Sequence, residues 1–376
     1  MSRPLHLTIQ EHFADLPDPR VERTRVHDLL DIVTIATCAV LCGADSWVEV
    51  ELFGTSKQDW FASFLALPGG IPSHDTFGRV FARLDPDAFV RGFLSLVQAA
   101  LPALEREVVA MDGKALCGAH DDGDAPRLLV SAFATTARLV LGHRPVDTDS
   151  NEIPAIPALL NLLDLSGSVI TADAIHCHTR TAHAIRAADA DYLLRLKRNQ
   201  PETHAAVVAW VAEAECDGWR QHPHQFLETV DTEHGRYEVR RYWTTTEPVL
   251  LAYLNPDARW PDLASVGVVR RQRETARGTS HETSYYLSSL DGDVRTFADA
   301  ARGHWGIENG QHWILDVAFR EDESRVRVDH GAENFATLRR IALNLLRQDT
   351  TTKAGTKARR LKAGWDERYL LRLLSQ

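Results

Sequence analysis

The sequence predicts an α/β protein that begins with a helical domain and continues into a mixed sheet covered by helices. Two observations lead to this prediction. Residues 20 to 100 repeat apolar positions at helical spacing, and after Leu101 short β-like runs such as EVVAM and GSVITADA come between helical patterns. Strands in a row, followed by strand, helix and strand, are typical of a mixed sheet with helices packed on it.

The N-terminal helices are separated by clear turn signals. PGGIP precedes Ser73, a good N-cap, and Asp85 and Pro86 end the helix expected over residues 73–84. This helix exposes His74, Arg79 and Arg83, which is compatible with a helix-turn-helix that binds DNA. Packing against neighbouring helices is the commoner role of such a helix, and we expect it here.

The later elements follow in a regular order. We expect strands over residues 107–111, 126–135, 138–146, 167–174 and 191–198, with helices over 151–165 and 180–190. A helix over 202–215 then leads into β-rich sequence, in which Gly235 is flanked by alternating residues typical of a hairpin. Helices resume over 296–319 and 332–348.

Bulk composition is that of a soluble globular protein. The chain has 376 residues, of which 44% are hydrophobic and 25% charged. Its longest apolar stretch, Ile32 to Gly43, is shorter than the roughly 18 to 20 residues that span a bilayer, and the N-terminus lacks the pattern of a secretory signal. Five scattered cysteines without a C-x-x-C pair indicate reduced thiols. We therefore predict a cytoplasmic protein that does not bind membranes.

The charge distribution is uneven. A net charge of −10 is unusual for a protein that binds nucleic acid, but residues 320–376 hold 13 Lys or Arg against 8 Asp or Glu. A second basic cluster, RRQRETAR, contains Arg270, Arg271, Arg273 and Arg277. Each cluster fits DNA contact and a solvated surface equally well.

Three carboxylates stand at positions that suit a metal site. Asp112, in MDGKALCGA, ends the first predicted strand of the mixed sheet, Asp173 follows a second apolar strand, and Glu308 lies in a helix far downstream. A carboxylate at the tip of a core strand is costly to desolvate unless it is paired, and Mg²⁺ prefers such oxygens. Two ions about 3.5 to 4 Å apart can stabilise the attacking and leaving oxygens at phosphorus. Spacing alone does not select this trio, because the chain has 52 acids.

Longer motifs resemble a known family. The blocks AMDGKALCGA, VITADAIHCHTRTAHAIRAADADYLLRLKRNQP and ARGHWGIENGQHWILDVAFREDESRVR, with NFATLRRIALNLLR, are similar to those of the H-repeat-associated insertion-sequence transposases. These are DDE transposases with a ribonuclease-H-like core. DLPDPR and GIPSHDTFGRVFARLDPDAF resemble the associated N-terminal domain, so the likeness covers nearly the whole chain in order.

The resemblance implies roles for individual residues. The catalytic, metal-binding acids fall on Asp112, Asp173 and Glu308, and two Mg²⁺ or Mn²⁺ ions are expected at each site. Expected contacts to DNA are Lys114, Lys197, Arg198, Arg302, His304, Arg339 and Arg340. Two departures stand out. In related cut-and-paste enzymes a tyrosine, an arginine and a lysine accompany the glutamate, but here Ala301, His304 and Leu315 take those positions, and His178 replaces an expected glutamine.

The resemblance also implies a domain organisation. We expect an N-terminal helical domain over residues 1–100 that could bind DNA ends, and the first part of the ribonuclease-H-like core over 101–200. A mostly β insertion domain follows over 201–295, then the core continues over 296–348 with the helix of Glu308. Residues 349–376 are expected to form a basic C-terminal tail, in which TTKAGTKARRLKAGW resembles a mobile basic connector.

The predicted function is metal-dependent cleavage of double-stranded DNA at transposon ends and strand transfer into target DNA. A homodimer on DNA and a bacterial, nucleoid-associated location follow from this prediction. Two alternatives remain, a domesticated nuclease that cuts without joining and a non-catalytic DNA-binding derivative. His304, Glu308 and His312 also share the spacing of a zinc site, which the resemblance disfavours. Trp305 and Trp313 are expected to pack into the core rather than stack on bases.

Overall fold

The N-terminal helices pack around one apolar helix. The computed structural model describes residues 9, 11–100, 106–118, 127–146, 154–232, 237–276 and 278–375. Twelve of the 13 residues of α2 are buried, and Asp28 caps its first turn through Leu30 N at 2.7 Å. Ser46 and Glu49 form a capping box at the start of α3, and Ser73 caps α5 as predicted. The elements are η1 (Glu22–Thr24), α2 (Leu29–Leu41), α3 (Trp47–Ser56), α4 (Gln58–Ala62), α5 (His74–Arg83) and α6 (Pro86–Ala100).

The core sheet confirms the predicted fold class. Its strands are β1 (Val108–Leu116), β2 (Arg127–Ala134), β3 (Leu139–Pro145), β4 (Val169–Ala172) and β5 (Asp191–Leu196). β1, β2 and β3 are antiparallel neighbours, whereas β4 lies parallel to β1 and β5 lies parallel to β4. Three antiparallel strands joined to two parallel strands form the mixed ribonuclease-H-like sheet that the sequence predicts.

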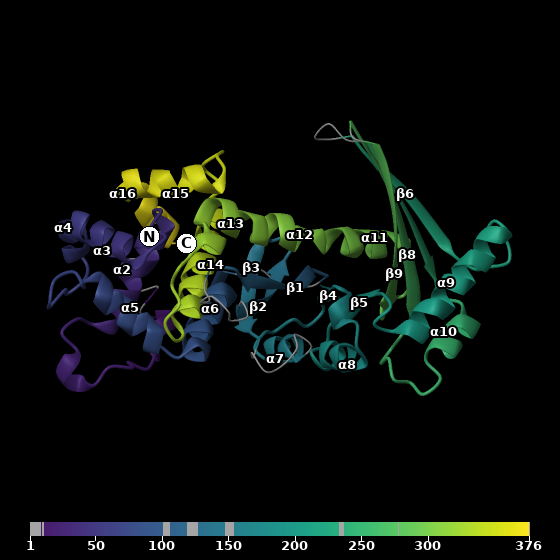
Figure 1. Cartoon of the computed structure of the whole chain (residues 1–376), viewed down its shortest axis with the longest axis horizontal. Coiled ribbons are helices and arrows are strands. Elements are labelled where there is room, and N and C mark those ends of the chain that lie inside the picture. Colours follow the sequence, from purple (N-terminus) through teal and green to yellow (C-terminus); the bar gives the residue numbers. More distant parts are fainter. Residues whose placement is uncertain are drawn as a thin grey trace.

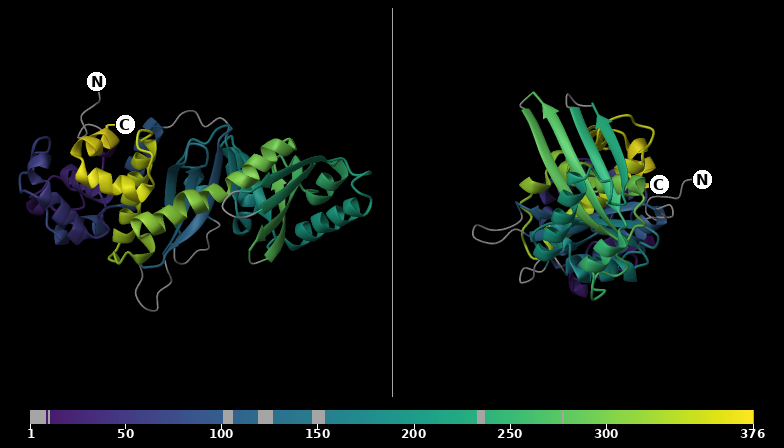
Figure 2. Two further views of the ribbon diagram at one scale, coloured as in Figure 1. Left: turned by 90° about the horizontal axis from the view of Figure 1, so that it is seen from above. Right: turned by 90° about the vertical axis from the view of Figure 1, so that its right-hand side faces the viewer.

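The insertion extends this sheet instead of forming a separate one. Its elements are α9 (Pro201–Cys216), β6 (Gln225–Asp231), β7 (Tyr237–Thr245), α10 (Pro248–Leu254), β8 (Ser265–Thr275) and β9 (Gly278–Ser288). β9 pairs antiparallel with β5, which gives a nine-stranded sheet in the order β3-β2-β1-β4-β5-β9-β8-β7-β6. The insertion therefore covers the edge of β5, where unpaired backbone groups would otherwise be exposed. Its long strands rise on the right in Figure 1, and Figure 2 shows the same strands from the side.

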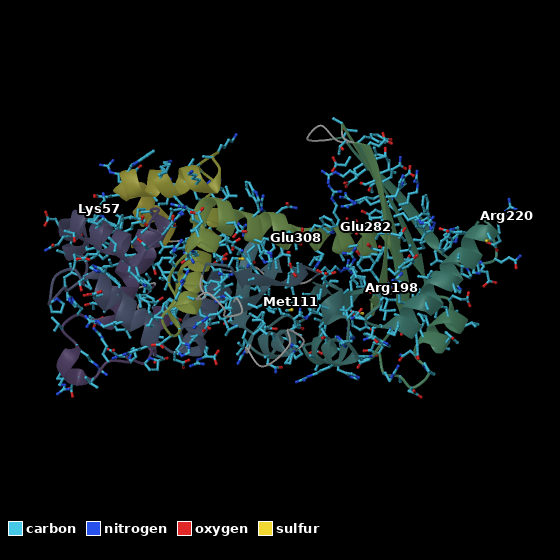
Figure 3. The ribbon with its side chains drawn as sticks, viewed as in Figure 1. Lys57, Met111, Arg198, Arg220, Glu282 and Glu308 are labelled. Atoms are coloured by element: carbon cyan, nitrogen blue, oxygen red, sulfur yellow. The ribbon has the colours of Figure 1, made fainter. Side chains whose placement is uncertain are left out.

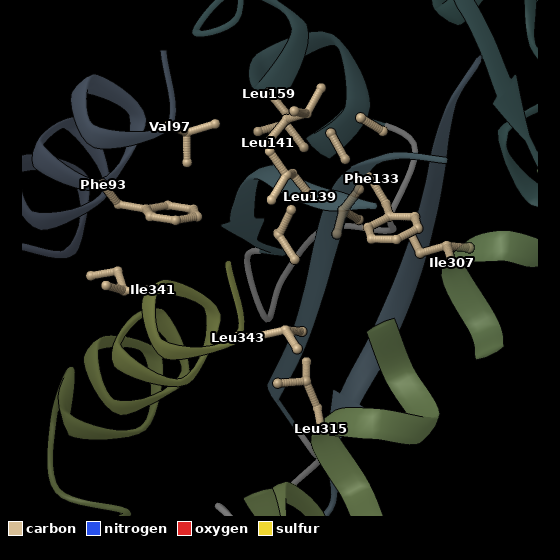
Figure 4. Packing of buried hydrophobic residues seen from close by; sticks show 14 of the residues in the cluster. Phe93, Val97, Phe133, Leu139, Leu141, Leu159, Ile307, Leu315, Ile341 and Leu343 are labelled. Atoms are coloured by element: carbon tan, nitrogen blue, oxygen red, sulfur yellow. The ribbon is translucent and has the colours of Figure 1, made fainter. Parts of the chain in front are cut away.

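Helices cover both faces of the core sheet. α7 (Ala155–Leu160) and α8 (Thr179–Ala187) lie on one face, with η2 (Ala174–His176) between β4 and α8. A run of helices crosses the other face: α11 (Val294–Gly303), α12 (Trp305–Ile307), η3 (Glu308–His312) and α13 (Trp313–Phe319), followed by η4 (Glu321–Glu323) and α14 (Gly331–Gln348). Figure 4 shows the apolar core in which Phe133 and Leu139 of the sheet meet Ile307 and Leu343. No helix of the described residues is long and apolar enough to cross a membrane.

The C-terminal segment is folded, which corrects the expectation of a mobile tail. It forms α15 (Thr356–Trp365) and α16 (Glu367–Leu374), which lie over the N-terminal helices (Figure 1). Tyr369, Leu370 and Leu373 are buried, since the apolar positions of α16 recur at helical spacing. The basic residues of this segment suggest a solvated tail, but the apolar stripe of α16 packs it on the rest of the protein.

Candidate active site

Asp112 and Asp173 are brought together by the register of two parallel strands. Met111 of β1 lies opposite Ala172 of β4, so the next residue on each strand is an aspartate. The sequence predicts that Asp112 ends its strand, and this prediction is wrong. β1 continues to Leu116, and Asp112 pairs with Ser131 of β2. It stands instead at the point where the pairing of β1 with β4 stops. Both carboxylates therefore lie at one edge of the parallel part of the sheet.

Glu308 reaches this edge from the helices that cross the sheet. It begins a π-helical turn, η3, between α12 and α13. Such turns are rare and occur often at functional sites. Glycines let this helical run approach the strands closely, since a Cβ on Gly303 would lie 3.0 Å from Val108 Cγ1 and one on Gly310 would lie 2.9 Å from Phe133 Cζ. Figure 3 shows Glu308 above the sheet, on the side that faces the long insertion strands.

The other two acids act electrostatically on Asp112. Burial, together with the negative charges of Asp173 and Glu308, raises the pKa of Asp112 to about 6, although a 2.9 Å hydrogen bond from Gly113 N opposes this. Burial acts in the same direction on Asp173. There, however, the Ala174 amide and the cations of Lys197 and Arg195 lower the pKa below its usual value. The Nζ of Lys197 and the Nη1 of Arg195 each lie 3.6 Å from Asp173 Oδ1.

Two histidines flank Glu308 on the same helical run. His304 Nδ1 lies 3.0 Å from Thr171 Oγ1, and His312 Nδ1 lies 3.7 Å from Asp112 Oδ2. Burial lowers the pKa of each imidazole to about 4, so both are neutral at neutral pH. His304 therefore offers no positive charge to a phosphate. Its predicted contact with DNA stays a prediction and would be made by a neutral imidazole.

The donor set suits a hard divalent cation. Asp173 Oδ1 is buried without a hydrogen bond, and the pKa of Asp112 is raised first by burial and then by the charges of Asp173 and Glu308. Carboxylate oxygens that repel one another are stabilised by a bound metal ion. With the side chains as placed, however, no three His, Cys, Asp or Glu residues of the described segments form a group that could hold an ion. This applies equally to the zinc alternative on His304, Glu308 and His312.

Comparison with known proteins shows the family of this chain. The model of the Transposase DDE domain matches residues 104–345, and that of its associated domain matches residues 10–97. The chain belongs to the DDE transposase family.

Relatives within the family match almost end to end. YncI of Escherichia coli O157:H7, a candidate transposase, is 34% identical over 98% of this chain and 94% of its own length. YhhI of E. coli K12, an H repeat-associated candidate transposase, is 33% identical over 98% of this chain and 97% of its own length. Among solved structures, a piggyBac transposase synaptic complex with hairpin DNA covers 96% of this chain and 76% of that one. Its identity of 12% and TM-score of 0.39 are too low to carry an inference.

The basic residues predicted to contact DNA fall into two groups in this DDE transposase. Lys197, Arg198 and Arg302 are exposed: Lys197 lies beside Asp173, and the Arg302 side chain is 52% exposed although it pairs with Asp231 at 3.0 Å. Lys114 is buried and bridges Asp316 at 2.7 Å and Asp322 at 2.8 Å. Its cation therefore links β1 to the segment after α12. Lys114 could contact a phosphate only if its ion pairs with both carboxylates were broken.

Arg339 and Arg340 of α14 are buried, which corrects the prediction that they form an exposed phosphate-binding face. They are 2% and 0% exposed, and Arg340 Nη1 donates to Glu321 Oε1 at 2.9 Å. Both faces of α14 are covered because the N-terminal helices and the sheet pack on it from opposite sides. These guanidinium groups thus lie in the interior of the DDE transposase and not on a surface that DNA could reach.

Two features near the acids were missed or misjudged from the sequence. Arg195 was not singled out, although it lies two residues before Lys197 on β5 and reaches Asp173. Trp305 and Trp313 were expected in the core but are 38% and 60% exposed. The π-helical turn lies between them, and the strict helical spacing used to assign their faces does not hold across it.

Proposed function

We propose that this family member cleaves double-stranded DNA at the ends of a mobile element and joins those ends to target DNA. The observation that supports the proposal best is the strand register that puts Asp112 and Asp173 at one edge of the parallel strands, with the negative charge of Glu308 also acting on Asp112. Carboxylates so placed suit the in-line displacement at phosphorus that the family performs.

The chemistry consists of two displacements at phosphorus. A water oxygen first bonds to phosphorus at the element's end, the bond to the 3′ oxygen breaks, and a 3′-hydroxyl is released. That hydroxyl then bonds to a target phosphorus, and the target's own 3′ oxygen leaves. Two Mg²⁺ or Mn²⁺ ions would stabilise the attacking and leaving oxygens when bound.

The residues of the chain have distinct roles in this proposal. Asp112, Asp173 and Glu308 would hold the ions, while Lys197 and Arg195 place positive charge beside Asp173, where a phosphate would approach. Neutral His312 lies against Asp112 and limits the directions in which its carboxylate can turn.

Joining two ends needs two sites, so the proposal includes a dimer on DNA, which light scattering of the complex tests.

Substitution of the acids tests the proposal directly. Asp112→Asn and Glu308→Gln should lower the rate of DNA cleavage at least about 10³-fold, since each removes a charge that no neighbour replaces. Labelled duplexes that carry the sequences flanking the gene, incubated with Mg²⁺ or Mn²⁺, provide the measurement. Asp299→Asn is the matched control, because this acid is exposed on α11 of the same helical run.

The products of this assay separate the alternatives. Strand-transfer products support transposition, whereas cleavage without joining supports a nuclease. Full activity of Asp112→Asn would contradict the proposed site. Absence of cleavage by the unsubstituted protein together with retained DNA binding would favour a non-catalytic derivative.

A further inference from the structure

A cleft separates the insertion strands from the helices that carry Glu308. It has a volume of about 680 Å³, and its walls come from β7, β8 and β9 on one side and from α11 and α12 on the other. In Figure 3, Glu282 of β9 and Glu308 mark its two sides. Six arginines line it: Arg138, Arg195, Arg240, Arg271, Arg273 and Arg302.

Strand alternation decides which arginines face the cleft. On β8, Arg271 and Arg273 line it, while Arg270, directly before Arg271, points to the opposite face and pairs with Glu215 at 2.5 Å. On β7, Arg240 lines the cleft and Arg241 points away, where it pairs with Glu228 at 2.6 Å. The sheet therefore divides neighbouring arginines between two surfaces.

The two surfaces differ in charge balance. On the outer face, Arg270 and Arg241 each have a carboxylate of their own. In the cleft, Glu282 is shared between Arg195 at 2.6 Å and Arg271 at 2.7 Å. Arg138 and Arg273 have no ion-pair partner among the residues that the structure describes, and Arg273 Nε is buried without a hydrogen bond. The cleft thus has surplus positive charge in a chain whose net charge is −10.

The cleft is continuous with the candidate active site. Arg195 bridges the two, since it lies against Glu282 and also 3.6 Å from Asp173. Arg271 stacks over the ring of Trp305 at 4.8 Å, three residues before Glu308. A charged ligand that follows the arginines therefore arrives at the acids.

We infer that this cleft binds the sugar–phosphate backbone of the DNA that enters the active site, with Arg138 and Arg273 as phosphate contacts. The inference rests on the proposed function. Arg271 and Arg273 are two residues apart on a strand, about 6.6 Å. Cations spaced in this way along a cleft match a polyanion with successive charges better than a single small anion. DNA phosphates would supply the partners that Arg138 and Arg273 lack.

A pair of double variants tests the inference. Arg138→Gln with Arg273→Gln should weaken binding of a labelled duplex about 10-fold or more and lower the slope of log K against log salt by about 2. Arg241→Gln with Arg270→Gln, which changes the outer face alone, should leave affinity within about 2-fold. Fluorescence anisotropy of the full chain in EDTA measures binding without cleavage.

A second measurement covers the case in which a double variant fails to fold. Ser280 lies opposite Arg273 in the sheet, and His281 lies opposite Gln272, so these neighbours on β9 face opposite sides. A photo-crosslinking residue at position 280 should attach to duplex DNA, and one at position 281 should not. Equal crosslinking at both positions, or equal affinity of the two double variants, overturns the inference.

The outcomes also distinguish this inference from the proposed function. If the Arg138→Gln and Arg273→Gln protein binds and cleaves DNA like the unsubstituted chain, the cleft is not the binding path, yet the proposed function stands. If only cleft variants lose affinity but the unsubstituted chain never cleaves, the cleft inference stands and the proposed catalysis fails.

Discussion

At the residue scale, buried ionisable groups show where this molecule retains charge for function and where it uses charge for structure. The pKa of Asp112 is raised to about 6 by burial and by two other acids, which is unfavourable for the ionised side chain at neutral pH. Arg340 and Glu321 are buried more deeply than Asp112 but form an ion pair at 2.9 Å. A cation-binding site requires a carboxylate without a partner charge, as at Asp112. A stable core requires paired charges, as at Arg340 and Glu321.

The buried His143 gives a prediction about pH. Burial holds its pKa well below the usual value, and its Nε2 lies 3.0 Å from Thr337 Oγ1 in the contact between β3 and α14. The unfolded chain binds a proton below about pH 6.5 and the folded chain does not, so stability falls as the pH decreases, by up to about 1.4 kcal/mol per pH unit. His143→Gln should reduce this slope.

Urea denaturation between pH 7.5 and pH 5 measures the effect. A suitable control is His74→Gln, since His74 is exposed and its pKa is raised by Glu51. An unchanged pH slope in His143→Gln would show that this imidazole is not held neutral.

At the element scale, the helical run α11–α13 positions the glutamate by packing small residues on the sheet. Gly303 and Gly310 meet Val108 and Phe133 at distances that leave no room for a side chain. The Gly310 carbonyl accepts a hydrogen bond from Arg347 of α14, so the π-helical turn is also held from outside. The position of Glu308 therefore depends on contacts two residues away from it.

Gly310→Ala should displace this turn. The added methyl group would lie 2.9 Å from the Phe133 ring, so the helix or the ring must shift, at a cost of about 1 to 3 kcal/mol in stability. We expect DNA cleavage to fall more than stability explains, because Glu308 moves with the helix. Thermal unfolding and the cleavage assay provide the two measurements. Gly355→Ala is the control, since nothing lies within 4 Å of its added Cβ, and equal activity of the two variants would contradict this role.

The sequence predicted most elements because each carries its own apolar period. The strands and helices of the core were expected within a few residues of where they lie, and α5 begins after Ser73 as its cap indicates. The continuation of β1 past Asp112 was not expected, because MDGKAL lacks a strong apolar pattern. Its pairing with β2 holds it in the sheet. The π-helical turn was not expected either, because its residues follow the helical pattern of their neighbours.

At the scale of the whole molecule, the C-terminal helices join the N-terminal helices to the helical run α11–α13. Arg360 of α15 is 4% exposed and donates to Val40 O at the end of α2, to Ala318 O of α13 and to Asp45 at 2.9 Å. Its guanidinium also lies 4.1 Å from the centre of the Phe319 ring. One side chain thus connects three parts of the chain that are far apart in sequence.

Arg360→Ala should destabilise the whole molecule by about 3 kcal/mol, because it leaves Asp45 and several carbonyl groups without their donor. Thermal unfolding followed by circular dichroism measures the change. Lys357→Ala on the same helix is exposed and should have little effect. Loss of stability by both variants alike would indicate a general charge effect instead.

The sequence by itself determined the mixed α/β fold and the family resemblance, which selects Asp112, Asp173 and Glu308 as candidate acids, because local periods and contiguous motifs are present along the chain. The tertiary structure alone decided which charges meet. Arg270 and Arg271 are adjacent and chemically identical, yet one faces Glu215 and the other faces Trp305 across the cleft. Arg339 and Arg340 resemble surface residues in sequence and are buried. The physical reason is that a side chain's electrostatic role depends on which element packs against its face, and that element is distant in sequence.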